Sequence, residues 1–307
     1  AVNPTMGIDY QEMATLHPAL VKKRIAIVGA GPAGLNAAIT ASHRGHDVVL
    51  YEAQDRLGGM LYYVGRPSFK IDYKKYMDYL IHTIESLNVD IRPNTPFTAE
   101  IAASENYDKI IVATGSEWFI PNIPGTRNGG ILNPLEVLDG NLPDVDNFLI
   151  CGAGLVGCEV AMHLTELGKN VTMIDIVPNS SPANLYGVDL SINARLAADH
   201  VNVELEKKIL SMSPTEVVCD TKKTATPHNP NTGKGTERPY NLSGPYDGGK
   251  KAYHADAVNC ALGMRSVNGL ANDLLAQGYP VEVIGDAQKV RKLLDAIHEG
   301  FHAGRRA

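Results

Sequence analysis

The chain has 307 residues, of which 28 are basic and 34 acidic, so its formal net charge is −6. That charge offers no general attraction to nucleic acid or to an anionic membrane surface. No apolar run reaches transmembrane length and no signal peptide is visible, which favours a cytoplasmic location. The four cysteines form no C-x-x-C pair, which fits a reducing compartment and indicates no metal site.

Residues 1–21 have no clear periodicity. We interpret them as a leader or linker with one short helix lying across the first domain. The first residue is alanine and not methionine, which suggests a piece processed or excised from a longer protein. The length of the whole chain predicts about two domains.

A dinucleotide-binding pattern opens the first domain. The apolar run 24–28 ends in Gly-x-Gly-x-x-Gly at residues 29–34, an alanine-rich helical segment follows, and a second apolar run ends in Glu52. In this order of strand, loop, helix and acid, the helix N-terminus binds a pyrophosphate and the acid accepts hydrogen bonds from a ribose. A glycine-rich turn without a ligand is the alternative.

Each glycine of this motif has its own expected role. Gly29 lets the chain turn sharply after the strand. Gly31 lacks a Cβ, so a pyrophosphate can approach the backbone there. Gly34 lets the helix lie close to the strand.

The same pattern occurs a second time. Gly152, Gly154 and Gly157 follow the apolar run 147–151, and Asp175 ends the next apolar run. The first glycine and the acid are equally far apart in both halves. Two such units predict two bound dinucleotides, or one bound nucleotide and one vestigial site.

Further elements complete the two halves. The Gly58–Gly59 pair predicts a loop that passes close to a ligand, or else a helix-capping turn. Short strands are expected at 89–92 and 109–113. An amphipathic helix is expected over residues 72–87, with an apolar side made of Tyr76, Tyr79, Leu80, Ile84 and Leu87.

The second half is joined to the first by residues 116–146, which are rich in proline and glycine. A helix over 189–198 and a strand over 201–205 are expected to belong to its sheet. Residues 220–254 have almost no aliphatic side chains and predict a long loop, or a β-hairpin with a mobile tip. Their lysines could contact a phosphate, although a solvated face is favoured.

The chain then returns to the first domain. An apolar run ends in Gly285-Asp286, and a helix is expected over 290–303. Asp286 would stand at the carboxyl end of a strand, where ligands bind in open α/β sheets, or it would be a plain N-cap. The pattern as a whole predicts an α/β fold of two Rossmann-like domains, the second inserted in the first.

Together these motifs resemble the two-dinucleotide-binding flavoproteins of the pyridine nucleotide-disulfide reductase superfamily. The resemblance rests on both glycine motifs with their acids, on residues 113–115 and on residues 284–286. It implies an FAD-binding domain made of residues 22–120 and 256–307. It also implies an NAD(P)H-binding domain of residues 121–255, which includes the polar segment 220–254.

A narrower resemblance points to the 2,4-dienoyl-CoA reductase and enoate reductase group. Residues 58–61, 261–265 and 294–300 are similar to the carboxyl-terminal half of those enzymes. The group carries an old-yellow-enzyme-like FMN barrel and a 4Fe-4S cluster before this module. Its last cluster cysteine commonly precedes a stretch like residues 1–4 here, which implies that the barrel and the cluster belong to an N-terminal part absent from this chain.

The resemblance also implies which residues bind the cofactors. Asp286 would bind the ribityl or pyrophosphate part of FAD, and the last helix would approach the flavin near residues 292–294. The implied FAD-binding residues are Gly29, Gly31, Pro32, Ala33, Gly34, Glu52, Ala53, Gly58, Gly59, Met60, Ala113, Thr114, Gly115, Gly285, Asp286 and Leu294. Those of the nicotinamide half are Gly152, Gly154, Leu155, Val156, Gly157, Asp175 and Gly263.

The second acid bears on the choice of nucleotide. Asp175 accepts hydrogen bonds from a ribose 2′-hydroxyl and repels a 2′-phosphate, and no arginine is near it in sequence, so NADH is favoured over NADPH. Basic residues from distant loops could overturn that choice. Glu159 resembles an acid that meets the nicotinamide in related reductases, with an ordinary first-turn helix glutamate as the alternative.

The expected activity is hydride transfer from NADH to FAD, a step that the cofactors carry. Cys151 and Cys158 are interpreted as core residues and not as a redox pair, so electrons would pass to the absent cluster and FMN. Three alternatives remain: an ADP- or FAD-holding scaffold with an inactive second site, a free-standing NADH oxidase, and a thioredoxin-reductase-like enzyme. A homo-oligomer is compatible with the sequence.

Overall fold

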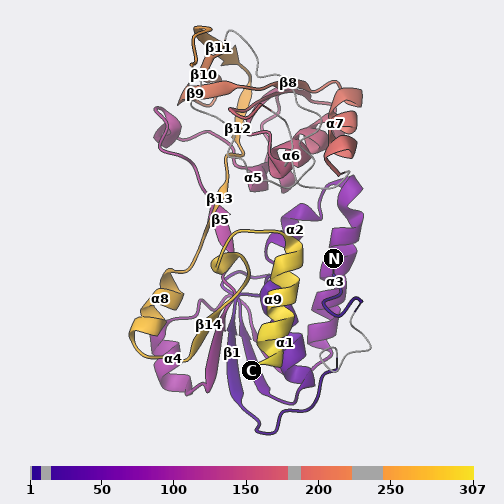
Figure 1. Ribbon diagram of the computed structural model, residues 1–307, viewed down its shortest axis with the longest axis vertical. Helices are drawn as coiled ribbons and strands as arrows, with labels where there is room; N and C mark the ends of the chain where they lie inside the picture. Colours follow the sequence, from indigo (N-terminus) through magenta and orange to yellow (C-terminus); the bar gives the residue numbers. More distant parts are fainter. Residues whose placement is uncertain (1, 8–14, 179–187, 223–244) are drawn as a thin grey trace. The chain divides into compact units, whose positions relative to one another are not determined.

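The computed structural model describes residues 2–7, 15–178, 188–222 and 245–307 (Figure 1). Contacts divide the chain into two compact units. Unit 1 comprises Ala1–Trp118 and Met264–Ala307, and unit 2 is the intervening Phe119–Gly263. Each unit is built on a parallel sheet flanked by helices, which confirms the α/β, Rossmann-like fold.

The sheet of unit 1 has five strands in the order β14-β4-β1-β2-β3, and neighbouring strands are all parallel. Both faces of the sheet are covered, which explains why the strands are runs of apolar residues with little alternation. The strands are β1 Arg24–Val28, β2 Asp47–Tyr51, β3 Val89–Arg92, β4 Lys109–Val112 and β14 Val281–Val283.

Alternate residues of β1 enter different cores. Ile25 and Ile27 pack in one core with residues of four helices, including Leu61, and Ala26 and Val28 pack in another with two helices on the opposite face. The first face carries α1 Pro32–His43, α3 Ile71–Glu85 and α9 Leu293–Arg305, and the second carries α4 Ala99–Glu105 and α8 Gly269–Ala276.

Helices α1 and α9 run side by side in the same direction (Figure 1). A Cβ on Gly300 would lie 2.2 Å from the carbonyl oxygen of Ala33, and one on Gly304 would lie 2.4 Å from that of Ala37. The two glycines therefore allow the helix backbones to touch. Because the helices are parallel, the start of α9 lies at the same edge of the sheet as the start of α1.

The expected helix over 72–87 is found as α3, but its apolar side was partly wrong. Leu80 and Ile84 are buried as expected, whereas Tyr79 is 62% exposed. Met77 takes the buried place instead, because residues 77, 80 and 84 share one narrow face of the helix. Leu87 lies beyond the helix, in the turn before β3.

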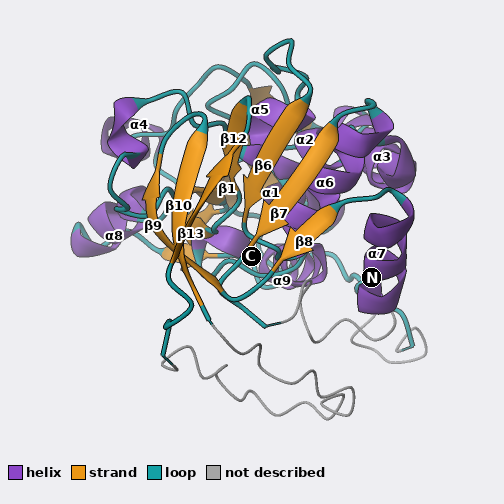
Figure 2. Cartoon of the chain, turned by 90° about the horizontal axis from the view of Figure 1, so that it is seen from above, coloured by secondary structure: helices purple, strands orange, loops and turns teal. Residues whose placement is uncertain are grey.

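The sheet of unit 2 has four parallel strands in the order β12-β6-β7-β8, and Figure 2 shows β6, β7 and β8 side by side. A three-stranded antiparallel sheet packs on one face of it. The strands are β6 Asn147–Cys151, β7 Asn170–Ile174, β8 Asn202–Glu204, β9 Lys207–Met212, β10 Glu216–Thr221, β11 Lys250–His254 and β12 Ala257–Cys260. The helices are α5 Pro134–Leu138, α6 Leu155–Glu166 and α7 Val188–Ala198.

Shorter elements connect these. In unit 1 a two-stranded ribbon stands where the chain leaves for unit 2 and returns from it. The ribbon strands are β5 Ser116–Trp118 and β13 Met264–Ser266, and the short helices are α2 Met60–Val64, η2 Ser68–Lys70, η3 Thr126–Asn128 and η4 Gly285–Ala287. None of the helices in the described part of the chain has the length and hydropathy of a bilayer crossing.

Three further sequence predictions concern residues 220–254, residues 1–21 and the last helix. Segment 220–254 has paired strand ends, β10 against β11, as the hairpin alternative requires, and its tip lies outside the described residues. No helix forms in the described parts of 1–21, residues 2–7 and 15–21, so the short helix expected there is not found in them. The last helix begins at Leu293 and not at 290, because Lys292 is extended and caps it.

Candidate functional site

The first glycine loop lies at the carboxyl end of β1. Gly29 has a φ of 102°, and a Cβ there would lie 2.4 Å from the carbonyl oxygen of Ala113. A Cβ on Gly34 would lie 1.8 Å from the carbonyl oxygen of Gly29. These two glycines are therefore required by the protein's own backbone, whatever the loop binds.

Gly31 differs from its neighbours. A Cβ added there would meet no atom within 4 Å, so the space over its Cα is open. Gly31 is also the N-cap of α1, and no side chain caps that helix. An open backbone at an uncapped helix N-terminus fits a pyrophosphate.

The second loop repeats this arrangement at the end of β6. A Cβ on Gly152 would lie 2.4 Å from the carbonyl oxygen of Ala261, and one on Gly157 would lie 1.9 Å from that of Gly152. Gly154 again faces open space and is the uncapped N-cap of α6. The residues therefore fit a dinucleotide in unit 2 as they do in unit 1.

The two acids hold their own loops in the same way. Glu52 Oε2 accepts a hydrogen bond from the Ala30 N–H at 2.8 Å, and Asp175 Oδ2 accepts one from the Ala153 N–H at 2.6 Å. The other carboxylate oxygen accepts the N–H of the residue two positions on, at 2.9 Å for Glu52 and 3.2 Å for Asp175. Each carboxylate has further lone pairs for a ribose hydroxyl.

The Gly58–Gly59 pair forms the helix-capping turn that was the alternative expectation, and its closeness to a ligand stays a prediction. The Gly58 N–H donates to the carbonyl oxygen of Ala30 at 2.9 Å, and a Cβ on Gly59 would lie 2.8 Å from the Cα of Gly31. The pair therefore packs against the first glycine loop. Gly59 is also the N-cap of α2, which begins at Met60.

Residues after the other strands of unit 1 reach the same edge of the sheet. The Ala113 N–H donates to the carbonyl oxygen of Val28 at 2.8 Å, next to Gly29. The Val267 N–H donates to the carbonyl oxygen of Gly115 at 3.0 Å, and the Thr114 hydroxyl donates to that of Val267. Ala53, directly after Glu52, is exposed.

Asp286 joins two connecting segments and does not cap a helix. Its Oδ2 accepts the Ser116 hydroxyl at 3.1 Å, and its Oδ1 accepts the Arg291 N–H at 3.0 Å. A Cβ on Gly285 would lie 2.9 Å from the Cβ of Ala33, so this turn lies against the start of α1. Leu294, in the first turn of α9, is 40% exposed.

No sequence motif indicated the ion pair between Glu299 and Arg291 behind that turn. Glu299 Oε2 accepts the Gly285 N–H at 2.7 Å, while its Oε1 accepts the Arg291 guanidinium. Arg56 was missed as well: it donates to the Tyr63 hydroxyl at 2.7 Å and lies 4.2 Å from the ring centroid of Tyr62. The available hint was the Tyr62-Tyr63 pair, which follows Gly59 after two residues.

Glu159 and two cysteines lie on α6 or at the end of the strand before it, and the role of Glu159 at a nicotinamide stays a prediction. Glu159 is buried and lies beyond the first turn of α6, so the alternative of an ordinary first-turn glutamate is wrong. Cys151 and Cys158 are buried free thiols, as expected of core residues. Burial raises the pKa of the Cys151 thiol well above its ordinary value.

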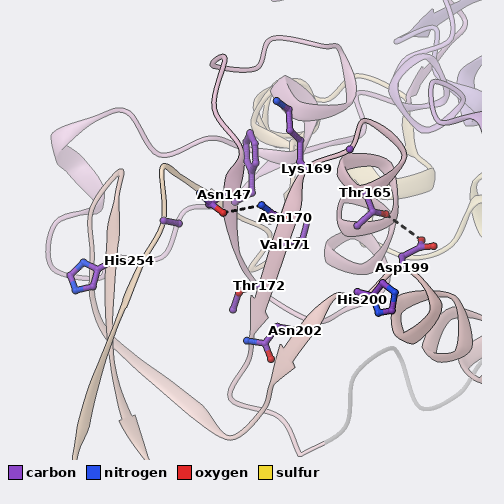
Figure 3. Close-up of a pocket in the computed structure, with 13 residues that line it drawn as sticks. Asn147, Thr165, Lys169, Asn170, Val171, Thr172, Asp199, His200, Asn202 and His254 are labelled. Carbon is purple, nitrogen blue, oxygen red and sulfur yellow. Dashed lines mark hydrogen bonds between the residues drawn. The ribbon is translucent and has the colours of Figure 1, made fainter.

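A groove of about 530 Å³ lies elsewhere in unit 2 (Figure 3). It stands at the amino ends of β6, β7 and β8, at the edge opposite to Gly152 and Asp175. Its polar groups bond one another: Asn170 donates to Asn147 at 3.1 Å, and Thr165 donates to Asp199 at 3.2 Å. In the described part of the chain, no cluster of His, Cys, Asp and Glu could hold a metal ion.

Comparisons with known proteins agree with this geometry. The family described as pyridine nucleotide-disulphide oxidoreductase matches residues 23–281. The NADH oxidase of Thermoanaerobacter brockii is 33% identical over 316 residues, which cover 98% of this chain and 43% of the relative. The cinnamate reductase of Clostridium sporogenes is 27% identical, with 99% of this chain and 42% of the relative covered.

Solved structures show the same fold. A 2-naphthoyl-CoA reductase complex superposes with a TM-score of 0.84 at 26% identity, over 100% of this chain and 43% of that chain. The thioredoxin reductase of Lactococcus lactis has a TM-score of 0.69 at 18% identity, over 93% and 97%. The chain spans less than half the length of the two curated relatives and of the reductase complex.

Proposed function

The chain belongs to the pyridine nucleotide-disulphide oxidoreductase family, and from that membership we propose an NADH-dependent flavoprotein module with FAD in unit 1 and NADH in unit 2. The observation that carries the proposal is the repeated loop. In both units the outer two glycines are fixed by the backbone, while the middle glycine, Gly31 or Gly154, faces open space. Open space over a backbone at an uncapped helix N-terminus suits the approach of a pyrophosphate.

The residues of unit 1 divide the work of holding FAD. The N–H groups at the start of α1 bind the pyrophosphate, and Glu52 accepts the adenosine ribose hydroxyls. Asp286 binds the ribityl or pyrophosphate part from the turn beside Ala33. Leu294 offers an exposed apolar side chain at the start of α9 to the flavin.

Unit 2 holds the nicotinamide cofactor with the equivalent parts. The start of α6 binds the pyrophosphate, and Asp175 binds the 2′-hydroxyl and repels a 2′-phosphate, which favours NADH. We place Glu159, which is buried on α6, near the nicotinamide. When bound, NADH and FAD supply the hydride transfer itself.

Electrons then leave to a partner domain. All four cysteines of the chain are buried and free, so no exposed thiol pair is available to accept electrons. The relatives are more than twice as long as the part that matches, which leaves room for an FMN barrel and a 4Fe-4S segment. We propose that this partner is of the enoate or dienoyl-CoA reductase type.

An anaerobic absorbance spectrum of the purified chain, before and after NADH, tests the proposal. We expect a flavin spectrum that bleaches with NADH, and a Gly154→Ala variant that retains the flavin and bleaches only at much higher NADH concentration. A flavin spectrum that NADH does not bleach would contradict the proposed role of unit 2 as the NADH site. A chain that neither carries nor takes up FAD would favour the ADP-holding scaffold.

A free-standing oxidase is the second candidate, because the Thermoanaerobacter brockii relative is an NADH oxidase. Oxygen consumption separates the two. Sustained NADH oxidation with oxygen as the acceptor, at a rate that an added one-electron acceptor does not raise, would favour the oxidase. A slow oxidase rate that rises strongly with the artificial acceptor would favour a module that passes electrons on.

A further inference from the structure

The chain beyond Asp175 runs beside the chain beyond β8. The Asp175 N–H donates to the carbonyl oxygen of Glu204 at 3.2 Å, and the Lys207 N–H donates to the carbonyl oxygen of Asp175 at 2.8 Å. The Glu206 N–H donates to the carbonyl oxygen of Val177 at 3.1 Å. Segments 175–177 and 204–207 are therefore neighbours at the carboxyl edge of the sheet. In dinucleotide folds this is where the 2′ position of the adenosine ribose lies.

Lysines also gather at this place. Thr221 pairs with Lys207 in the β9–β10 ladder, so Lys222 lies opposite Glu206. The Lys222 ammonium is 3.1 Å from Glu206 Oε1, and the two side chains are only 12% and 8% exposed. Lys207 lies 4.0 Å from a carboxylate oxygen of Glu204. Each lysine thus has a carboxylate beside it.

The charges at this edge decide what it can bind. A free lysine next to Asp175 would attract the phosphate that distinguishes NADPH from NADH. A lysine neutralised by a buried carboxylate gives no such attraction, and the pair itself is weak support for the fold, because burying two charges costs about as much as their attraction returns. The position of the pair therefore makes more sense as a filter on the nucleotide than as a source of stability.

We propose that Glu206 is a specificity-determining residue, which neutralises Lys222 and so denies the 2′-phosphate of NADPH a cation beside Asp175. This inference rests on the proposed function of unit 2. It differs from the role of Asp175, because Asp175 acts on the ribose directly, whereas Glu206 acts through Lys222.

The test uses half-ligands, so that it does not depend on electron transfer. Binding of 5′-AMP and 2′,5′-ADP to the whole chain is measured by calorimetry for the wild type, Glu206→Gln, Lys222→Met and the double variant. Gln keeps the size of Glu206 and its acceptor for Lys222 but removes the charge. Glu216→Gln is the charge-matched control, because Glu216 is on the same sheet but pairs with His254 at 3.4 Å.

We expect Glu206→Gln to tighten 2′,5′-ADP binding about tenfold, as one unpaired charge at a partly screened distance would, and to leave 5′-AMP binding unchanged. The double variant should lose that gain, and Glu216→Gln should show none. A gain that survives in the double variant, or equals that of Glu216→Gln, would overturn the inference, as would no gain at all. The inference would also be overturned if the wild type bound 2′,5′-ADP more tightly than 5′-AMP and Lys222→Met abolished that preference.

The same data separate this inference from the proposed function. If the half-ligands bind with the expected pattern but NADH does not bleach the flavin, the inference stands and the hydride transfer is wrong. If neither half-ligand binds, both are overturned. Thermal unfolding of each variant shows whether a change in binding reflects a loss of fold. Lys222→Met breaks the same ion pair by removing the lysine, so it shows the effect of losing the pair without leaving an unpaired positive charge.

Discussion

Replacing Gly31 with alanine should weaken FAD binding and leave the stability of unit 1 nearly unchanged, whereas the same change at Gly34 should destabilise unit 1. The Gly31 backbone has φ −74° and ψ −177°, which alanine adopts without strain, and its Cβ would meet no atom within 4 Å. At Gly34 the new Cβ would lie 1.8 Å from the carbonyl oxygen of Gly29. The two glycines are three positions apart in one motif and yet serve different purposes.

The expected magnitudes follow from these contacts. Overpacking against backbone at Gly34 should cost about 3 kcal/mol or more, which lowers Tm by about 6 °C or more in a unit of this size. At Gly31 the change should alter stability by less than about 1 kcal/mol. The new methyl group at Gly31 would push the pyrophosphate away from the backbone, so that one N–H no longer donates to it. The loss of one such hydrogen bond should weaken FAD binding by about 10- to 100-fold.

The assay measures apoprotein titrated with FAD, by quenching of flavin fluorescence, together with thermal unfolding of the apoprotein. Gly269→Ala is the matched control, because a Cβ there also meets nothing within 4 Å but the residue begins α8, which packs on the opposite face of the sheet from α1. Wild-type FAD affinity in Gly31→Ala would refute the placement of the pyrophosphate. A Gly34→Ala variant of wild-type stability would refute the backbone contact.

Three further predictions concern other residues. Gly154→Ala should weaken NADH binding while FAD affinity stays at the wild-type value; equal loss of both, in titrations, would count against separate sites. Burial raises the pKa of Cys219 to about 11 and also raises the pKa of Cys151 well above its ordinary value, so iodoacetamide at pH 8 should label no cysteine until the chain is denatured; rapid native labelling, seen by mass spectrometry, would contradict this. Burial, with nearby positive charges, lowers the pKa of His46, so the folded chain binds fewer protons than the unfolded chain and loses stability as pH falls below about 6.5. In urea unfolding, His46→Gln should lose less stability than the wild type as pH falls below about 6.5. An identical loss in both proteins would show that His46 is not the source of this pH dependence.

Much of the fold follows from short-range patterns in the sequence. The glycine loops, their flanking apolar runs and the terminal acids are local features whose geometry depends on neighbouring residues, so the strands and helices around them could be predicted closely. Tyr79 could not be placed, because the width of a buried helix face depends on what packs against it. The start of α9 was set by the extended Lys292, which periodicity does not show.

The partners of the site residues were harder to predict. Asp286 was expected to be a ligand or a cap, and the structure shows bonds to Ser116 and to the Arg291 backbone. Ser116 is distant in sequence, and only the sheet order β14-β4-β1 brings its segment close. The Lys222–Glu206 pair depends likewise on strand register between β9 and β10, which no local motif encodes.

Glu52 bonds to the Ala30 N–H and Asp175 bonds to the Ala153 N–H, so each acid ties its glycine loop to the end of the following strand. Both bonds are made within the protein's own chain, so each acid orders its loop as part of folding as well as offering lone pairs to a ribose. Ordering that folding supplies need not be supplied by the cofactor, which favours tight binding. Substituting either acid to change the nucleotide preference would therefore also loosen the cradle, and a redesign needs a new acceptor for the Ala30 or Ala153 N–H.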